Sequence, residues 1–369
     1  MKKKYIIFSI VTLVLLVSFL SYSKYLKTTN VCKEDVKPTK ITKGISMNLE
    51  QTAGAGDYKT VTQSSWPTKG YKFNAELSRC ENGSTLSWDD TKKAVIMQGN
   101  VSDKCYVYFD KILTLAEYVI SQYTGTQGDN ALYYHNSTLT NGAGDNSYRY
   151  AGASDSVNNY ICLGSDATTC PDANLFRIIG VFGDQTKVIR AKSVGDKQWH
   201  TSPNNTWSSS SLNTYLNGEY LTSLGTIAEK IATTTWKVGG GSSTYLYDVP
   251  TTAYQYEVGS SASTTTYDAK IGLMYVSDYG FAADQSGWTT KLDSYGSNSS
   301  KNWLYLGSFE WTISRSSDRT YGAFLVNSAG HVDGGGVGSS SGVRPSFNLE
   351  SSVKYVSGSG SMSDPVRVN

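Results

Sequence analysis

The sequence predicts an α+β protein that begins with an N-terminal transmembrane helix, continues into a small β-sandwich-like module and ends in a larger mixed domain. Three observations lead to this prediction. A long apolar run follows a basic N-terminus, short alternating runs fill residues 44–112, and helical patterns followed by many short strands fill residues 147–369. These segments do not repeat one another, which disfavours a solenoid or a propeller.

The N-terminal run sets the expected compartment. Three lysines precede an uncharged stretch, residues 5–23, that is long enough to cross a bilayer as a helix. Lysines before a span stay in the cytoplasm, so residues 1–27 are expected to anchor a single-pass cell-membrane protein whose remainder is extracellular. The alternative is a cleaved signal peptide, because Ser21-Tyr22-Ser23 resembles a cleavage site; the protein is then secreted.

Net charge excludes one class of partner. The chain has a formal net charge of +2, and five lysines lie within its first 27 residues. The rest is close to neutral, so we expect no nucleic-acid partner. Only three His and five Cys are present, which leaves little material for a metal centre.

Export permits disulfides, and the cysteine spacing suggests two of them. Cys80 and Cys105 flank a strand-rich segment, and Cys162 and Cys170 enclose a short polar loop. Four cysteines allow three connectivities, so these pairings rest on geometry alone. Cys32 is left over next to the membrane.

The elements follow in order. Residues 28–43 are a polar stalk, and in residues 44–112 the alternation of Tyr71, Phe73, Ala75 and Leu77 predicts a strand with one buried face. In residues 113–146, a Thr114–Glu117 capping box begins a helix that leads into a polar linker.

The larger domain begins at residue 147. A strand is predicted over residues 175–182, with a tight turn at Gly183-Asp184 and a return strand. Leucines and tyrosines at helical spacing predict a helix over residues 211–221, and Thr226–Glu229 matches a second capping box. Residues 269–277 are expected to form a buried strand, followed by short strands between Gly-, Ser- and Asn-rich loops.

Several long sequence motifs of the larger domain resemble those of one protein family. The motifs are Asn174-Leu-Phe-Arg-Ile-Ile-Gly-Val-Phe, Ile271-Gly-Leu-Met-Tyr-Val-Ser-Asp-Tyr-Gly-Phe-Ala, Asn302-Trp-Leu, Trp311-Thr-Ile-Ser-Arg and Gly342-Val-Arg-Pro-Ser-Phe-Asn-Leu. They are similar to an uncharacterised family of Gram-positive bacterial surface proteins. The C-terminal domain of that family, of unknown function, resembles the fold of formylglycine-generating enzymes (the sulfatase-modifying-factor type) and of C-type-lectin-like receptors. The resemblance covers residues 147–369 and implies a lectin-like scaffold there.

The known chemistries of the resembling folds do not carry over. No Cys follows Cys170, so the copper-binding Cys pair of formylglycine-generating enzymes is absent. His135, His200 and His331 are isolated, and the sequence triplets of calcium-dependent lectins do not occur. We therefore expect no catalytic residue, no transition metal and no cofactor. Asp166, Asp172 and Asp184 lie in polar loops where a structural calcium ion would find oxygen ligands, but no D-x-D-x-D-G run is present and ordinary solvated turns are the favoured explanation.

A few residues remain as candidates for ligand binding. Trp288 lies in a polar loop and is the best exposed aromatic, whereas Trp303 and Trp311 lie in strands and are expected in the core. Asn327, His331 and Asp333 lie in a Gly-rich loop between two strands. Arg344 is predicted to be buried beside a carboxylate such as Glu310 or Asp318, with an anion-binding role as the alternative.

The sequence thus favours non-catalytic recognition of an extracellular protein or glycan through the C-terminal loops. Two alternatives remain open: a cell-envelope hydrolase or modifying enzyme that uses the same cleft, and a structural adhesion spacer without a discrete ligand.

Overall fold

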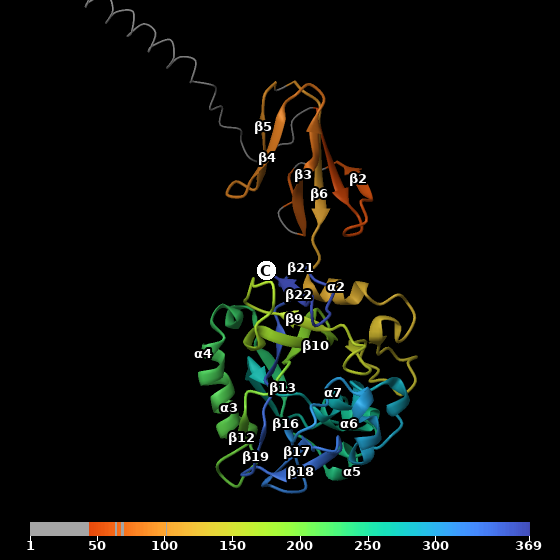
Figure 1. Ribbon diagram of the computed structural model, residues 1–369, viewed down its shortest axis with the longest axis vertical. Coiled ribbons are helices and arrows are strands. Elements are labelled where there is room, and N and C mark those ends of the chain that lie inside the picture. The colour runs from red at the N-terminus through yellow and green to blue at the C-terminus, as the bar shows by residue number, and fades with distance from the viewer. Residues whose placement is uncertain (1–43, 63–64, 68–69, 101) are drawn as a thin grey trace, which may run out of the picture. The chain divides into compact units, whose positions relative to one another are not determined.

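The computed structural model describes residues 44–369 except 63–64, 68–69 and 101 (Figure 1). The chain forms two compact units, one that ends at Lys111 and one that spans Ile112–Asn369. Residues 113–146, expected as a helix and a linker, are part of the larger unit.

The predicted fold class needs correction. The described chain consists of mixed sheets with few, short helices. No helix in this part of the chain has the length and apolar character to cross a membrane. Its longest α-helix, α6 (Pro250–Glu257), has 8 residues and extends about 12 Å, whereas a bilayer core is about 30 Å thick. The span predicted for residues 5–23, the stalk at 28–43 and Cys32 lie outside the described residues.

The smaller unit contains a four-stranded sheet in the order β2-β1-β6-β3 and a separate hairpin, β4–β5. Its strands are β1 (Ile45–Glu50), β2 (Tyr58–Val61), β3 (Tyr71–Cys80), β4 (Thr85–Asp89), β5 (Ala94–Gln98) and β6 (Cys105–Lys111). Phe109 of β6 contacts the rings of Trp66, Phe73 and Trp88, so the sheet and the hairpin share one core.

The predicted buried face of β3 is only half present. Tyr71 and Phe73 pack against the core. Ala75 and Leu77 are exposed because the β3–β6 register shifts between Asn74 and Arg79. Such an irregularity redirects the side chains that follow it.

Both predicted cysteine pairs are disulfides in the structure. Cys80 and Cys105 lie opposite each other in the β3–β6 register, and Cys162 joins Cys170 across a separation of 8 residues.

Removal of each disulfide has a different expected cost. Replacing Cys80 and Cys105 by Ser is expected to lower the free energy of unfolding of the smaller unit by about 3 kcal/mol, because the open chain regains the entropy of a loop whose ends are 25 residues apart. The shorter Cys162–Cys170 loop is expected to contribute about 2 kcal/mol to the larger unit. Urea unfolding with and without reductant measures both. Equal stability of wild type and variants would contradict the prediction.

The larger unit contains a nine-stranded sheet, a five-stranded sheet in the order β12-β19-β16-β17-β18, and a two-stranded sheet, β13–β14. The strands of the nine-stranded sheet are β7 (Leu132–Tyr134), β8 (Tyr148–Tyr150), β9 (Tyr160–Cys162), β10 (Leu175–Phe182), β11 (Gln185–Arg190), β15 (Ile271–Gly272), β20 (Ser346–Leu349), β21 (Tyr355–Ser357) and β22 (Val366–Val368). The other strands are β12 (Asp196–Gln198), β13 (Thr234–Lys237), β14 (Thr266–Ala269), β16 (Glu310–Arg315), β17 (Gly322–Val326), β18 (Val332–Gly336) and β19 (Ser340–Gly342).

Short helices flank these sheets. In Figure 1, α3 and α4 lie on one flank of the larger unit and α5, α6 and α7 on another. The remaining helices are α2 (Leu115–Ser121), α3 (Ser211–Tyr215), α4 (Leu221–Ser223), α5 (Ser243–Leu246), α7 (Val276–Phe281), the π-helix η4 (Leu216–Tyr220) and the 3₁₀-helices η1 (Asp129–Ala131), η2 (Asp172–Asn174), η3 (Trp207–Ser209), η5 (Gly225–Lys230), η6 (Gln285–Gly287) and η7 (Leu292–Lys301).

Three predictions that rest on short sequence patterns are confirmed. The Thr114–Glu117 capping box begins α2, the 211–221 helix begins at the cap Ser210, and β10 turns into β11 with Phe182 opposite Gln185. The second capping box is wrong, because residues 225–230 form a 3₁₀-helix without a side-chain cap. The strand predicted over 269–277 is also wrong beyond its first residues, since α7 begins at Val276.

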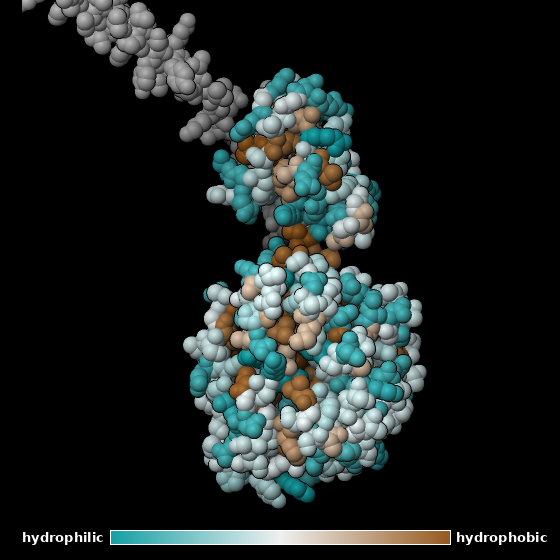
Figure 2. Space-filling view, in the orientation of Figure 1, coloured by the Kyte–Doolittle hydropathy of each residue, from teal (hydrophilic) through white to brown (hydrophobic). Residues whose placement is uncertain are grey.

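The core of the larger unit includes many buried tryptophans. Trp303 and Trp311 are buried, as predicted. Large exposed apolar side chains are few among the described residues of this unit: Leu306, Phe309, Tyr321, Val356 and Met362. On the face shown in Figure 2, hydrophobic residues are scattered among pale and hydrophilic ones.

Candidate functional site

Trp288 cannot serve as an exposed binding residue. Its side chain is 0% exposed, and its indole N–H donates to the carbonyl oxygen of Ala283 at 2.9 Å. The ring lies edge-on to Tyr133 and Phe281 and close to His135. The prediction that Trp288 is exposed was wrong. It relied on the polar residues next to Trp288 in the sequence, whereas the residues that pack around the ring come from other segments.

Asn327, His331 and Asp333 lie together on the β17–β18 hairpin. Asn327 closes the turn, since its side-chain oxygen accepts from the amides of Ala329 and His331 at 3.0 and 3.1 Å. His331 is half-buried, and its Nδ1 accepts from the amide of Gly296 at 3.2 Å. Asp333 alone is exposed, so only it is free to meet a ligand.

Asp333 lines a shallow groove of about 630 Å³. Its walls are mostly glycines and serines, together with Asp196 of β12 and the half-exposed ring of Phe309. Trp288, Asn327, His331 and Arg344 do not line it. The structure therefore does not gather the five predicted binding residues around one surface.

Arg344 is buried beside Glu310, one of the two carboxylates that the sequence suggested for it. Its Nε and one terminal nitrogen donate to the two carboxylate oxygens of Glu310 at 2.6 and 2.8 Å. The same nitrogen also donates to the carbonyl oxygen of Leu304 at 2.5 Å. Arg344 is 1% exposed, and Nε and one terminal nitrogen are engaged in a buried ion pair.

The three histidines do not form a catalytic arrangement. Nδ1 of His135, His200 and His331 accepts from the backbone amides of Ala143, Ser202 and Gly296 respectively. Within the described residues, no hydrogen bond or ion pair joins a histidine to a serine hydroxyl, a cysteine or a carboxylate. A serine or cysteine nucleophile activated by histidine thus has no support in the described geometry.

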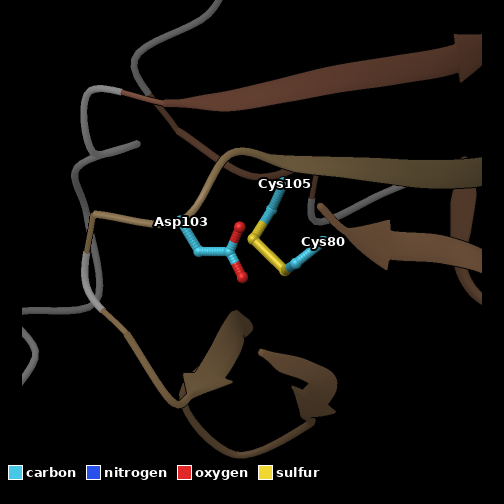
Figure 3. A group of neighbouring side chains, drawn as sticks. All are labelled: Cys80, Asp103 and Cys105. Carbon is cyan, nitrogen blue, oxygen red and sulfur yellow. A yellow bond between two sulfur atoms is a disulfide. The ribbon is translucent and has the colours of Figure 1, made fainter. Parts of the chain in front are cut away.

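One group of potential metal ligands occurs among the described residues: Cys80, Asp103 and Cys105 (Figure 3). The two sulfurs are bonded to each other, so neither is a thiolate. The Asp103 carboxylate accepts from the amides of Asn82 and Ser84 at 2.9 and 3.1 Å. These three residues therefore stabilise the smaller unit through a disulfide and hydrogen bonds. Asp166, Asp172 and Asp184, the predicted calcium candidates, form no comparable group.

A different site stands out in the larger unit, a pocket of about 180 Å³ with charged and aromatic walls. We call it the ion-pair pocket. Its lining residues are Asp145, Arg149, Phe182, Lys187, Thr234, Thr235, Trp236, Lys237, Tyr254, Val258, Tyr275, Ser277, Asp278 and Asn348. Apolar pockets with a few converging polar groups are the usual form of a small-ligand site.

Four charges meet in this pocket. Lys187 Nζ lies 2.5 Å from one oxygen of Asp278, and Arg149 lies 3.5 Å from the other. Arg149 also contacts the carboxylate of Asp145 at 2.6 Å. Burial lowers the pKa of Lys187, and the Asp278 carboxylate opposes that shift. Each charge has an opposite partner, which is what allows them to be buried.

Aromatic rings surround the two cations. The Arg149 guanidinium lies 4.5 Å from the ring centre of Phe182 and 5.3 Å from that of Tyr254. Lys187 Nζ lies 4.5 Å from the ring centre of Tyr275. These cation–π contacts help fix both side chains in place.

Long-range packing positions these residues. Arg149 lies on β8, which pairs with β10 at Gly180; a Cβ at Gly180 would collide with the carbonyl oxygen of Tyr148. Glycine is therefore required for β8 to approach so closely. Lys187 lies on β11, and Asp278 lies in the first turn of α7.

Glu257 fixes the N-terminal turn of α7 through hydrogen bonds. Its carboxylate accepts from the amides of Val276 and Ser277, both at 2.9 Å, and from the hydroxyl of Ser314. Burial raises the pKa of Glu257, and these hydrogen bonds oppose the shift. Because Asp278 lies in the same turn, Glu257 indirectly positions Asp278 for the ion pairs.

Asp145 makes stability depend on pH. Burial opposes its charge, but Arg149 and Ser147 outweigh burial and lower the pKa of Asp145 from 3.8 to about 2. A lowered carboxyl pKa stabilises the fold above the unfolded pKa, and this stabilisation is lost as pH falls from about 4 through 2. We expect the loss to be about 2 kcal/mol.

Urea unfolding of wild type and Asp145→Asn at several pH values isolates this contribution. Wild type should exceed the variant in stability at pH 7 and lose that advantage near pH 2. A difference that does not change with pH would exclude the mechanism.

Sequence reasoning found little of the ion-pair pocket. It did not identify Arg149, Lys187 or Asp278. A signal was present for one of them: Asp278 is the single charge in the largely apolar stretch 271–282, and a charge that folds into the core needs a partner. The residues next to each charge in the sequence do not show which residue is its partner in the fold.

Comparison with known proteins assigns no activity. Residues 183–351 match a domain of unknown function (DUF6273). The match lies within the larger unit and includes Lys187, Asp278 and Asn348 of the ion-pair pocket. No curated protein and no solved structure matched the chain.

Proposed function

We propose that the chain is an exported protein whose larger unit binds an extracellular glycan in the ion-pair pocket without altering it chemically. The observation that carries the proposal is the pocket itself. Its aromatic walls and buried polar groups match what a sugar ring requires: an apolar face to cover and hydroxyl groups to hydrogen-bond.

Export is supported by the two disulfides, which persist in oxidising surroundings. Binding without reaction is supported by the state of the buried charges. Asp278 is shared by Lys187 and Arg149, and Asp145 is held by Arg149 and Ser147. A general base or nucleophile needs a group free to accept or attack, and these groups are engaged with each other.

The test is a glycan array with the full chain and a variant that fills the pocket. Thr235 is exposed, lies on β13 and lines the pocket, so Thr235→Trp places an indole at the mouth without removing a buried charge. Thr266 is an exposed threonine on the paired strand β14 and does not line the pocket, so Thr266→Trp is the matched control.

We expect wild type and Thr266→Trp to bind the same glycans and Thr235→Trp to lose at least about tenfold in affinity. Binding that survives Thr235→Trp would move the site elsewhere, for example to the Asp333 groove. Absence of any glycan ligand would overturn the proposal, and a shortened or modified glycan after incubation would favour the enzyme alternative.

A further inference from the structure

Most carboxylate oxygens of the ion-pair pocket already accept hydrogen bonds. One oxygen of Asp145 accepts from the amide and hydroxyl of Ser147, and the other accepts from Arg149. One oxygen of Asp278 accepts from Lys187 and from the amide of Tyr275 at 2.8 Å, and the other faces Arg149. Asp145 is therefore engaged through both oxygens, whereas the second oxygen of Asp278 has Arg149 at 3.5 Å as its contact among the described residues.

The donors are not all in use. An ammonium group has three N–H bonds, and Lys187 makes one side-chain hydrogen bond, to Asp278, within the described residues. Lys237 is half-buried in the pocket lining and takes part in none of the ion pairs between described residues. The pocket therefore has a surplus of donors, which suits a ligand rich in acceptor oxygens.

The net charge of the pocket lining also favours a ligand rich in oxygen acceptors. Arg149, Lys187 and Lys237 are positive, whereas Asp145 and Asp278 are negative, which leaves one positive charge unmatched. Glu257 lies behind α7 and is occupied by the amides of that helix, outside the lining. A ligand with one negative charge would complete the pairing, and partial burial would strengthen its attraction to Lys237.

Two further features favour a sugar ring over a lone carboxylate side chain. Asn348 Oδ1 is buried without a hydrogen-bond partner in the structure, so it offers an acceptor for a ligand hydroxyl. The volume of about 180 Å³ leaves room for about six water molecules, which is close to the size of one pyranose ring. An aspartate or glutamate side chain would leave both Asn348 and the aromatic walls unmatched.

We infer that the group bound in the ion-pair pocket is an acidic monosaccharide, with its carboxylate against Lys237 and Lys187 and a ring hydroxyl on Asn348. This inference rests on the proposed glycan binding and adds the charge of the ligand. It assigns Lys237 as the residue that selects acidic over neutral sugars.

The experiment is calorimetric titration of the full chain with two oligosaccharides that differ only in the terminal sugar, glucuronic acid or glucose. We expect the acidic oligosaccharide to bind at least about tenfold more tightly and its affinity to fall as salt rises. Lys237→Gln should remove most of this preference, so that the affinity for the acidic oligosaccharide falls toward the affinity for the neutral one. Lys291 is exposed and outside the pocket, so Lys291→Gln is the control and should behave as wild type.

The outcomes separate the two proposals. Equal binding of both oligosaccharides, abolished by Thr235→Trp, would overturn the charge inference and leave glycan binding intact. Tighter binding of a polyglutamate peptide than of the acidic oligosaccharide would assign the pocket to acidic protein segments and overturn the inference. Failure of both oligosaccharides, together with an empty glycan array, would overturn the proposed function itself.

Discussion

The Asp278→Asn variant is expected to lose about 3–5 kcal/mol of unfolding free energy in the larger unit. Asn retains the size of the side chain but removes the charge that Lys187 and Arg149 share. Lys187 is then a buried ammonium without an opposite charge in contact, since its side chain is 6% exposed. Stranding one partner of a buried pair costs more than the pair contributes to stability, because the desolvation of the remaining charge is no longer offset.

Urea unfolding followed by tryptophan fluorescence measures this effect. The control is Asp293→Asn, at an exposed aspartate without an ion pair among the described residues, which should change stability by less than about 0.5 kcal/mol. The double variant Asp278→Asn/Lys187→Met should recover part of the loss, because it removes the stranded charge. A loss below about 1 kcal/mol in Asp278→Asn would show that the pocket charges are already well hydrated.

A loss of similar size is expected for Arg344→Met. The variant leaves Glu310, which is 2% exposed, without the two hydrogen bonds that hold its charge. Burial already raises the pKa of Glu310, and Arg344 opposes that shift. Without Arg344 the carboxyl group should take up a proton or destabilise the fold, so we expect a loss of about 3–5 kcal/mol at pH 7 that becomes smaller on acidification.

A surface pair of equal length provides the control. Lys192 lies 2.6 Å from Asp172, but both side chains are more than half exposed. Lys192→Met should therefore cost at most about 1 kcal/mol. If both variants lose the same stability, burial does not determine the strength of these pairs, and the argument for Arg344 fails.

The two charged centres show how far the sequence could lead. Arg344, between a valine and a proline, was predicted to be buried beside a carboxylate such as Glu310 or Asp318, and the structure selects Glu310. Lys187 stands between Thr186 and Val188 on a predicted return strand, yet its partner Asp278 is 91 residues away and directly follows the segment 269–277 that was predicted to be a strand. An error in the local structure of that segment concealed the ion pair.

The predicted exposure of Trp288 was wrong for a related reason. Trp288 was assigned to the surface from its polar neighbours in sequence, but the ring packs against Tyr133 and Phe281. Whether an aromatic side chain is exposed depends on which segments cover it, and sequence neighbours carry little of that information. The hairpin that bears Asn327, His331 and Asp333 was placed correctly between two strands, but two of the three side chains serve its own turn and packing.

The sequence by itself determined the features that depend on near neighbours: the capped helix α2, the β10–β11 hairpin and the two cysteine pairs. Each depends on a hydrogen bond, a turn or a loop closure within a few tens of residues, so the residue pattern indicated it, although the similar pattern at Thr226–Glu229 begins no capped helix. Only the tertiary structure decided the ion-pair pocket. Burial of Arg149, Lys187 and Asp278 is favourable only when strands β8 and β11 and helix α7 bring the opposite charges together, and that pairing is a property of the packed fold.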